Sequence, residues 1–524
     1  MAAHSLFTTV ELVYLTLSFL SVPECARVLL VNKLFFRQGV NLVWSQLSSP
    51  APLFAIFCRH ELEVSPSGFR NYKIFAPKKI STERREYLSV YANCVRKVTN
   101  FREAFQRQHV RWTGLDGLIR QGPVAAKVQV IEVSWGDSIT RSTNVSNIVK
   151  LLLGPDTSTL RCHGSGFPGL SVREAEGVLR RAQTVGSRLT ELMLQTENPD
   201  TEEALVALTA TIREFELLAA VDLSKELVTG SMLDCMRDLP NLERLALALP
   251  SETAEVSLWD YFVNEGDWVG QPFPSLRSLA FHDSACSAVH RLLSARRPFL
   301  HGITQLYVQL ESRLGPRSSG SAGLGSFISL VELIVGEASS VQDLTITPPH
   351  NPDGPWRFSP EVLSLLFSLD LRRLALHNVR LPIDSPGLAL IDGKWPLLSH
   401  LVMPFQHVRP NTLLQLAKRE ALRLLRVEVL APQLGEEVLT DETAVNGSTA
   451  PMRLEGQFDM RETGEHTVET MARLLLYCWP SVSLVWRNRL ENWPLEDPSQ
   501  AAYIALLAKV SELRGGGLQA IFAS

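Results

Sequence analysis

Residues 240–247 read PNLERLAL, and this phrase decides the fold that the sequence predicts. Leu242, Leu245 and Leu247 stand at the first, fourth and sixth positions of the pattern apolar-x-x-apolar-x-apolar. Because strand side chains alternate between two faces, this spacing predicts a short strand whose apolar positions point inward. Residues 274–281, PSLRSLAF, repeat the phrase, which indicates a recurring structural unit.

The pattern recurs through the middle of the chain at intervals of 24 to 41 residues. Its clear instances begin at Leu189, Leu218, Leu242, Leu276, Ile303, Leu330, Leu371, Leu398 and Leu422, a further match begins at Val341, and weaker ones begin at Val95, Val128, Ile148 and Val482. Intervening residues predict returning helices, as where Ser359-Pro360-Glu361 offers an N-cap, a proline at the first helical position and an acid. One strand and one helix cannot bury their apolar faces alone, so the units must stack.

The period resembles that of leucine-rich repeats, which implies an α/β solenoid. That family usually has Asn or Cys two residues beyond the last strand position, whereas residues such as Ser284 and Gln406 stand there in this sequence. We therefore predict an irregular solenoid over 95–485, with a non-repetitive α/β protein as the alternative. A Ser/Gly-rich loop is expected at 316–326 and an exposed acidic insertion within 432–470, notably at 440–450. Amphipathic helices at 467–477 and 499–513 are expected to cap the open end, the last within a capping region at 486–524.

The N-terminal residues 8–47 predict three short helices, whose apolar residues exceed what so small a module can bury. Leu12, Leu15, Phe19 and Leu20 share one helical face, and Pro23 forces a turn. The order and spacing resemble the F-box, the module of cullin ubiquitin ligases that binds a Skp-type adaptor, although Thr8-Thr9 stand where that family has Leu-Pro. The resemblance implies an F-box over 1–50, followed by a helical linker over 51–94. It also implies an adaptor-binding set comprising Leu12, Leu15, Phe19, Leu20, Pro23 and Trp44.

Together the two patterns resemble the fungal F-box proteins with degenerate leucine-rich repeats. The resemblance implies a substrate-recognition subunit whose F-box binds the adaptor, and through it a cullin, while the solenoid binds a target protein. The alternative is a repeat scaffold that works without a ligase. Strand positions between the inward leucines should face the target, which selects Arg244, His282, Gln305, Tyr307, Gln309, Arg373, His377, His400, Arg426 and Glu428. These mostly basic and neutral polar residues favour a polar or acidic protein segment.

Enzymatic chemistry is not expected, because no motif assembles an active site. The sequence has no P-loop, and Cys162-His163 is better read as a buried thiol beside a turn than as a metal site. No cofactor and no metal are expected. Residues 59–127 hold 14 Lys and Arg against 6 Asp and Glu, and a solvated face explains this excess better than nucleic-acid binding. Seven scattered cysteines, no evident signal peptide and no long apolar run predict a cytoplasmic or nuclear protein that binds no membrane.

Overall fold

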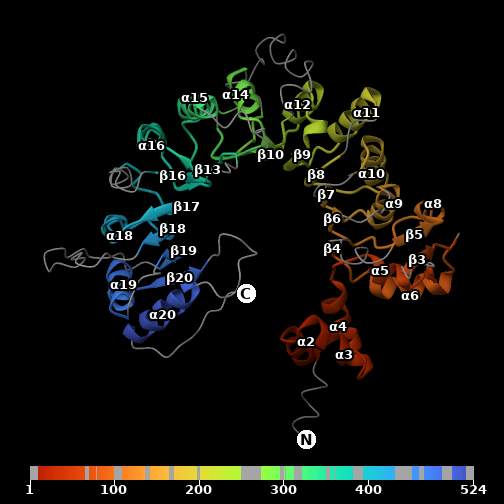
Figure 1. Cartoon of the computed structure of the whole chain (residues 1–524). Coiled ribbons are helices and arrows are strands. Elements are labelled where there is room, and N and C mark those ends of the chain that lie inside the picture. Colours follow the sequence, from red (N-terminus) through yellow and green to blue (C-terminus); the bar gives the residue numbers. More distant parts are fainter. Residues whose placement is uncertain are drawn as a thin grey trace, which may run out of the picture. The chain divides into compact units, whose positions relative to one another are not determined.

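The computed structural model describes residues 10–64, 70–77, 79–99, 109–135, 142–164, 170–196, 201–249, 273–295, 300, 302–311, 321–349, 354–358, 360–381, 394–430, 451–459, 465–486 and 498–514. These residues alternate between strands and helices along most of the chain (Figure 1). The chain divides into two compact units. Unit 1 comprises Met1–Leu247 with Phe273–Ser275, and unit 2 comprises Ala248–Pro272 with Leu276–Ser524.

Unit 1 is built on a parallel sheet with the strand order β1-β4-β6-β7-β8-β9-β10. The strands are β1 (Gln46–Leu47), β4 (Lys97–Thr99), β6 (Val130–Trp135), β7 (Thr159–Gly164), β8 (Glu191–Leu194), β9 (Ala220–Leu223) and β10 (Arg244–Leu247). The connecting helices that lie along one face of this sheet are α8 (Leu115–Ile119), α9 (Ser142–Leu152), α10 (Val172–Thr184), α11 (Glu202–Arg213) and α12 (Gly230–Arg237), with a 3-10 turn η1 (Lys225–Leu227) before α12 (Figure 1).

Unit 1 begins with a three-helix module and a small second sheet. The module consists of α2 (Val10–Ser18), α3 (Val22–Val28) and α4 (Lys33–Trp44). In the second sheet, β3 (Arg70–Phe75) pairs antiparallel with β2 (Arg59–Val64) and parallel with β5 (His109–Thr113). The helices α5 (Ala51–Ala55) and α6 (Thr82–Ala92) complete this region. The segment 51–94, predicted as a helical linker, thus differs from that prediction, because it contains two strands as well as two helices.

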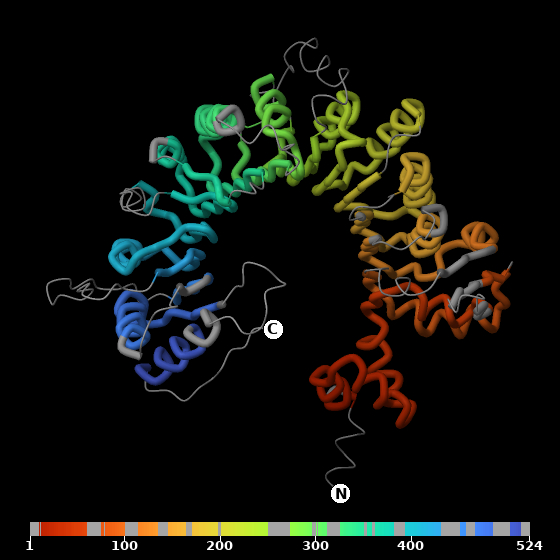
Figure 2. Tube along the Cα trace, in the orientation of Figure 1, coloured from red at the N-terminus to blue at the C-terminus, as the bar shows by residue number. Residues whose placement is uncertain are grey.

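Unit 2 repeats the parallel architecture with the strand order β11-β12-β13-β15-β17-β18-β19-β20. The strands are β11 (Ser278–Ser284), β12 (Gln305–Leu310), β13 (Asp343–Thr347), β15 (Arg373–Leu376), β17 (His400–Val408), β18 (Leu424–Leu430), β19 (Met452–Asp459) and β20 (Val482–Trp486), with a separate pair β14 (Trp356–Arg357) and β16 (Val379–Arg380). The helices are α14 (Cys286–Ala295), α15 (Ser321–Glu337), α16 (Pro360–Leu366), α18 (Pro410–Ala417), α19 (Glu465–Cys478) and α20 (Pro498–Leu513). The strand–helix alternation can be followed along the tube in Figure 2.

Helix α10 shows how the sequence sets one repeat. Ser171 and Glu174 form a capping box, in which the Ser171 hydroxyl accepts from the Glu174 N–H at 3.2 Å. Val178 and Leu179 lie on a buried stripe that recurs every three to four residues, and both are fully buried. In this repeat, a capped amphipathic helix therefore connects β7 to β8 and covers one face of the sheet.

A single row of leucines forms the spine of unit 2. The parallel register aligns one leucine from every strand of its main sheet, and all of them are buried: Leu279, Leu306, Leu344, Leu374, Leu401, Leu425, Leu454 and Leu484. Each unit thus buries its leucine against those of its neighbours, as the repeat pattern predicts. The α/β solenoid resembling leucine-rich repeats is confirmed.

Two strands predicted from this pattern are wrong. The residues that begin at Leu330 lie in α15, and those that begin at Ile148 lie in α9. Phe327, Leu330 and Ile334 are buried at three- and four-residue spacing, which is the face of a helix. The strand of that repeat is β13, which begins within the match that starts at Val341.

The loop predicted at 316–326 and the acidic insertion also differ in part from expectation. Residues 321–326 form the first turns of α15, and β19 lies within 432–470. Residues 316–320 and 440–450 lie outside the described residues, as do Thr8-Thr9. Helices α19 and α20 occupy the positions predicted for the C-terminal cap, where Leu475 and Leu506 are fully buried.

Two polar residues take over the task that asparagine has in regular leucine-rich repeats. The Ser284 hydroxyl accepts from the Leu249 N–H at 2.8 Å and donates to the His282 carbonyl at 2.9 Å. Buried Gln406 accepts from the Leu381 N–H at 2.7 Å and donates to the His407 carbonyl at 2.8 Å. At these two turns, side chains of different lengths satisfy the buried backbone in place of an asparagine.

The leucine spine gives a first testable expectation. Leu374→Ala should lower the free energy of unfolding by about 2–5 kcal/mol, because a buried side chain between two neighbouring leucines is replaced by a cavity. Leu397→Ala is the matched control, since Leu397 is 55% exposed, and it should change stability by about 0.5 kcal/mol or less. Urea denaturation of the two variants checks this. Equal stabilities would contradict the assignment of Leu374 to the core.

Candidate protein-interaction sites

The three-helix module has a small core of its own. Val13 and Leu17 of α2 pack with Cys25, Leu29 and Phe35, all of them buried. Gly39 of α4 permits this close packing, since a Cβ there would lie 2.3 Å from Leu29 Cδ2. The module is therefore a folded unit in which one face of α2 is already used.

Local hydrogen bonds fix the turns between the three helices. Glu24 accepts from the N–H and the hydroxyl of Ser21, at 2.9 and 2.6 Å, and these bonds lower the pKa of its carboxyl group. Asn32 caps α4 by accepting from the N–H groups of Leu34 and Phe35, both at 2.9 Å. The sequence signals for helix starts at these two positions thus specify the path of the chain.

The other side of the module exposes apolar side chains. We call this set the module surface; its members, all of them exposed, are Val10, Leu12, Tyr14, Leu15, Phe19, Val22, Leu30 and Val31. Helix α2 is apolar on nearly all sides, although one side already contacts the core of the module. A cluster of exposed large apolar side chains is typical of a protein-binding site.

The predicted adaptor-binding residues fall into two groups in the structure. Leu12, Leu15, Phe19 and Pro23 are exposed. Leu20 is half-buried and packs against the core of the module. The sequence did not single out Tyr14, Val22, Leu30 and Val31, because an apolar pattern on every side of a short helix does not reveal which side stays exposed.

Trp44, the last predicted adaptor residue, joins the module to the rest of unit 1. Its ring lies 4.7 Å from that of Tyr91 on α6, and Phe36 meets the same ring at 6.0 Å. Tyr87 contacts Tyr91 both ring to ring, at 5.4 Å, and hydroxyl to hydroxyl, at 3.2 Å. Burial and the Tyr87 hydroxyl raise the pKa of Tyr91 to about 12. These four aromatic residues fasten α4 to α6.

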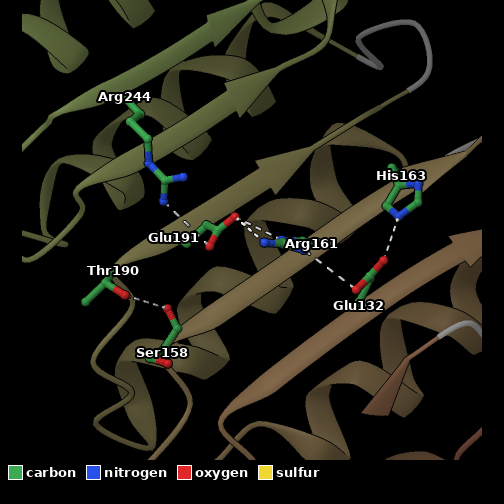
Figure 3. A network of polar contacts seen from close by, with 7 residues as sticks. All are labelled: Glu132, Ser158, Arg161, His163, Thr190, Glu191 and Arg244. Atoms are coloured by element: carbon green, nitrogen blue, oxygen red, sulfur yellow. Dashed lines mark hydrogen bonds and ion pairs between the residues drawn. The ribbon is translucent and has the colours of Figure 1, made fainter. Parts of the chain in front are cut away.

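A second candidate surface is the face of each sheet that the helices leave uncovered. In unit 1 it carries a charged network across β6, β7, β8 and β10 (Figure 3). Arg161 lies 2.8 Å from Glu191 and 3.7 Å from Glu132, which also approaches His163 at 3.6 Å. Arg244 lies 4.0 Å from the second carboxylate oxygen of Glu191. Of the predicted target residues, only Arg244 belongs to this network, whose charges largely compensate one another.

The remaining predicted target residues lie in unit 2, and nearly all are exposed or half-buried, as strand alternation requires. His282 and Tyr307 stack at 5.2 Å, and the Tyr307 hydroxyl donates to Gln309 at 2.8 Å. Burial raises the pKa of Tyr307. Glu428 differs from the rest, because it is 6% exposed and accepts from His407 at 2.9 Å.

Two histidines on this face have lowered pKa values. For His377 the causes are burial and then the positive charges of Arg426 and Arg373. For His400 they are burial and then Arg373, opposed by Asp343. Arg373 lies 3.6 Å from Asp343, whose own pKa is raised because burial outweighs its cationic neighbours.

These shifts predict how stability depends on pH. Because the folded state holds His377 and His400 neutral, it binds fewer protons than the unfolded chain near the ordinary histidine pKa of 6.5. The stability that depends on these neutral histidines is therefore fully present above pH 6.5 and is lost as the pH falls below that value. Urea midpoints measured across this range should fall less steeply for a His377→Gln, His400→Gln double variant than for the wild type. Parallel curves would contradict the lowered pKa values.

Other kinds of site are not evident in the described part of the chain. No group of three or more His, Cys, Asp or Glu residues there could hold a metal ion. None of the helices that can be described has both the length and the apolar character to cross a membrane. Cys162 is fully buried, with a pKa raised to about 12 by that burial, so its thiol is held in the protonated form.

Comparisons with known proteins add little to this description. No family model and no curated protein matches the sequence. Among solved structures, the chain is similar to one described as the crystal structure of the Rad7 and Elc1 complex in yeast. The similarity has 13% sequence identity and a TM-score of 0.36, and covers 68% of this chain and 84% of that one. A TM-score this low does not establish a common fold. The fold of this chain is defined by its own strand pairing and burial.

Proposed function

We propose that this protein is a substrate-recognition subunit of a cullin ubiquitin ligase, in which the three-helix module binds a Skp-type adaptor. The exposed apolar module surface carries this proposal. Leu15 on α2 and Phe19 directly after its C-terminal end are exposed to water, whereas Val13 and Leu17 of α2 are packed in the core of the module. Apolar groups at the centre of such a patch supply most of the energy of protein association.

The nature of the partner follows from the resemblance of residues 8–47 to the F-box. Phe19, Pro23 and Leu20 stand in the stretch that carries this resemblance, and the first two are exposed. A second copy of the chain is the competing occupant of the same surface. It would give a dimer in the absence of any adaptor, which a sizing column distinguishes from a monomer that binds an adaptor.

The solenoid then serves to hold the target. Its repeats carry polar side chains on the uncovered sheet faces, and the aromatic contacts of Tyr91 fasten the module to the first repeats. In this role the protein contributes proximity and orientation, while the chemistry of ubiquitin transfer occurs on other subunits.

Reconstitution tests the proposal. The full chain, a Skp-type adaptor and a cullin are mixed in all combinations and separated by size. We expect the chain to elute with the cullin only when the adaptor is present. A chain that never joins the adaptor and cullin would instead be a repeat scaffold without a ligase.

The aromatic link gives a further prediction. Tyr91→Ala removes three ring contacts, each worth about 0.5–1.5 kcal/mol, so it should destabilise the protein by roughly 1.5–4.5 kcal/mol. The adaptor should still bind, because the core of the module does not contain Tyr91. Thermal unfolding and adaptor pull-down on the same sample check both points. Loss of adaptor binding in a folded variant would show that Tyr91 acts through the module surface.

A further inference from the structure

Four basic side chains in unit 2 surround two small residues on the uncovered face of the sheet. Arg373 on β15 and His400 on β17 are register partners. Two residues further along these strands, Ala375 and Val402 are partners, and Val402 also pairs with Arg426 on β18. His377 directly follows β15, and its N–H donates to the Ile346 carbonyl at 2.9 Å.

The two small residues form a floor beneath the basic side chains. Ala375 is 1% exposed and Val402 is 8% exposed, although both alternate to the uncovered face. Neighbouring long side chains must therefore cover them. An incoming group would therefore contact the longer side chains that surround Ala375 and Val402.

Two arginines lie close enough to His377 to affect its pKa. Both Arg373 and Arg426 act on this imidazole, and each lowers its pKa. Negative groups lie toward the edges of the cluster. Asp343 pairs with Arg373, Glu428 with His407, and Glu455, which is opposite Arg426 in the register, with Arg453 at 2.7 Å.

We propose that Arg373, His377, His400 and Arg426 form a binding site for an anionic side chain of an extended peptide. Two arginines on strands separated by one other strand can donate several hydrogen bonds to a single anion, and charge-assisted bonds of this kind are strong. Half-burial of His377 and His400 reduces the competition from water. The anion is a carboxylate or a phosphate monoester, since both groups accept from arginine in the same way.

This site depends on the proposed function in one respect, namely that the bound peptide would be part of the ligase target. It names the chemistry by which the solenoid would recognise that target. The Asp343 and Glu455 carboxylates at the two edges would disfavour a uniformly acidic ligand. The site therefore fits one anionic residue flanked by neutral residues better than a long acidic run.

Three fluorescein-labelled peptides of otherwise identical neutral sequence test the proposal, with serine, glutamate or phosphoserine at the centre. Their binding to the full chain is followed by fluorescence anisotropy. We expect at least one anionic peptide to bind roughly tenfold or more tightly than the serine peptide. Tight binding of the phosphoserine peptide alone would identify phosphate as the anion, whereas binding of both would show that a carboxylate suffices. Equal binding of all three peptides would overturn the proposal.

Variants locate the site. Arg373→Gln with Arg426→Gln should remove most of the preference for the anionic peptide. Arg180→Gln with Arg213→Gln removes the same charge from the exposed surfaces of α10 and α11 and should leave the preference unchanged. Equal losses in the two double variants would reduce the effect to net charge and refute a site. Adaptor binding, measured on the same proteins, should be unaffected, so that failure of this site and failure of the proposed ligase role can be distinguished.

Discussion

A protein carrying Leu15→Asp and Phe19→Asp should lose its affinity for a Skp-type adaptor while keeping its fold. Leu15 on α2 and Phe19 directly after its C-terminal end are 52% and 82% exposed, so the aspartates cost little in the free protein. In the complex, each would place a charge in an apolar contact without a partner. Apolar residues that dominate an interface contribute about 2 kcal/mol or more apiece, so we expect the two changes together to weaken binding roughly a thousandfold.

The matched control for this variant lies elsewhere in unit 1. Val206 on α11 is 58% exposed, and Val206→Asp introduces the same kind of change away from the module. It should leave both adaptor binding and the melting temperature unchanged. The comparison is made by pull-down and thermal unfolding of all three proteins. If the double variant retains its adaptor, the module surface is not the docking site.

The second large effect is expected at Gly456 in β19. Its φ is +151°, and a Cβ there would lie 1.8 Å from the Val427 carbonyl oxygen of the neighbouring strand. Gly456→Ala would therefore combine backbone strain with a clash at a position that pairs with both β18 and β20. We expect the free energy of unfolding to fall by roughly 2–5 kcal/mol.

Gly336 on α15 provides the comparison for this substitution. A Cβ there would meet nothing within 4 Å, and the residue lies in a helix. Gly336→Ala should stabilise the protein by up to about 1 kcal/mol, because alanine has the higher helix propensity. Urea denaturation of both variants measures the difference. A Gly456→Ala protein as stable as the wild type would mean that β18 and β19 pair differently.

The sequence predicted the strands best where leucine spacing allows a single interpretation. LERLAL at 242–247 contains β10, and β11 begins within LRSLAF at 276–281. LVELIV at 330–335 fits a strand and a helix equally well, and only the burial of Phe327 and Ile334 on the same face shows that it is helical. Strand β19 was missed for two reasons. Gly456 stands opposite Val427, where the repeat pattern requires an apolar residue, and the strand lies in an acidic segment that resembles an insertion.

The candidate sites could be predicted only in part, because their residues are brought together by register. Alternation correctly placed Arg373 and His400 on the uncovered face of the sheet. It could not show that Ala375 and Val402 are partners or that Arg426 stands beside them, since these residues come from three repeats. Helical spacing likewise put Leu15 and Leu20 on one face, whereas α2 ends at Ser18, Leu15 is exposed and Leu20 is half-buried.

The most direct test of the proposed role is a calorimetric titration of the intact protein with a purified Skp-type adaptor. Burial of the module surface predicts a single saturable site per chain, with a Kd of about 1 µM or tighter and a negative heat-capacity change, the mark of apolar burial. The Leu15→Asp, Phe19→Asp protein should give no heat of binding in the same titration. Absence of saturable binding by the wild-type chain would contradict the proposal that its N-terminal module connects the solenoid to a ligase.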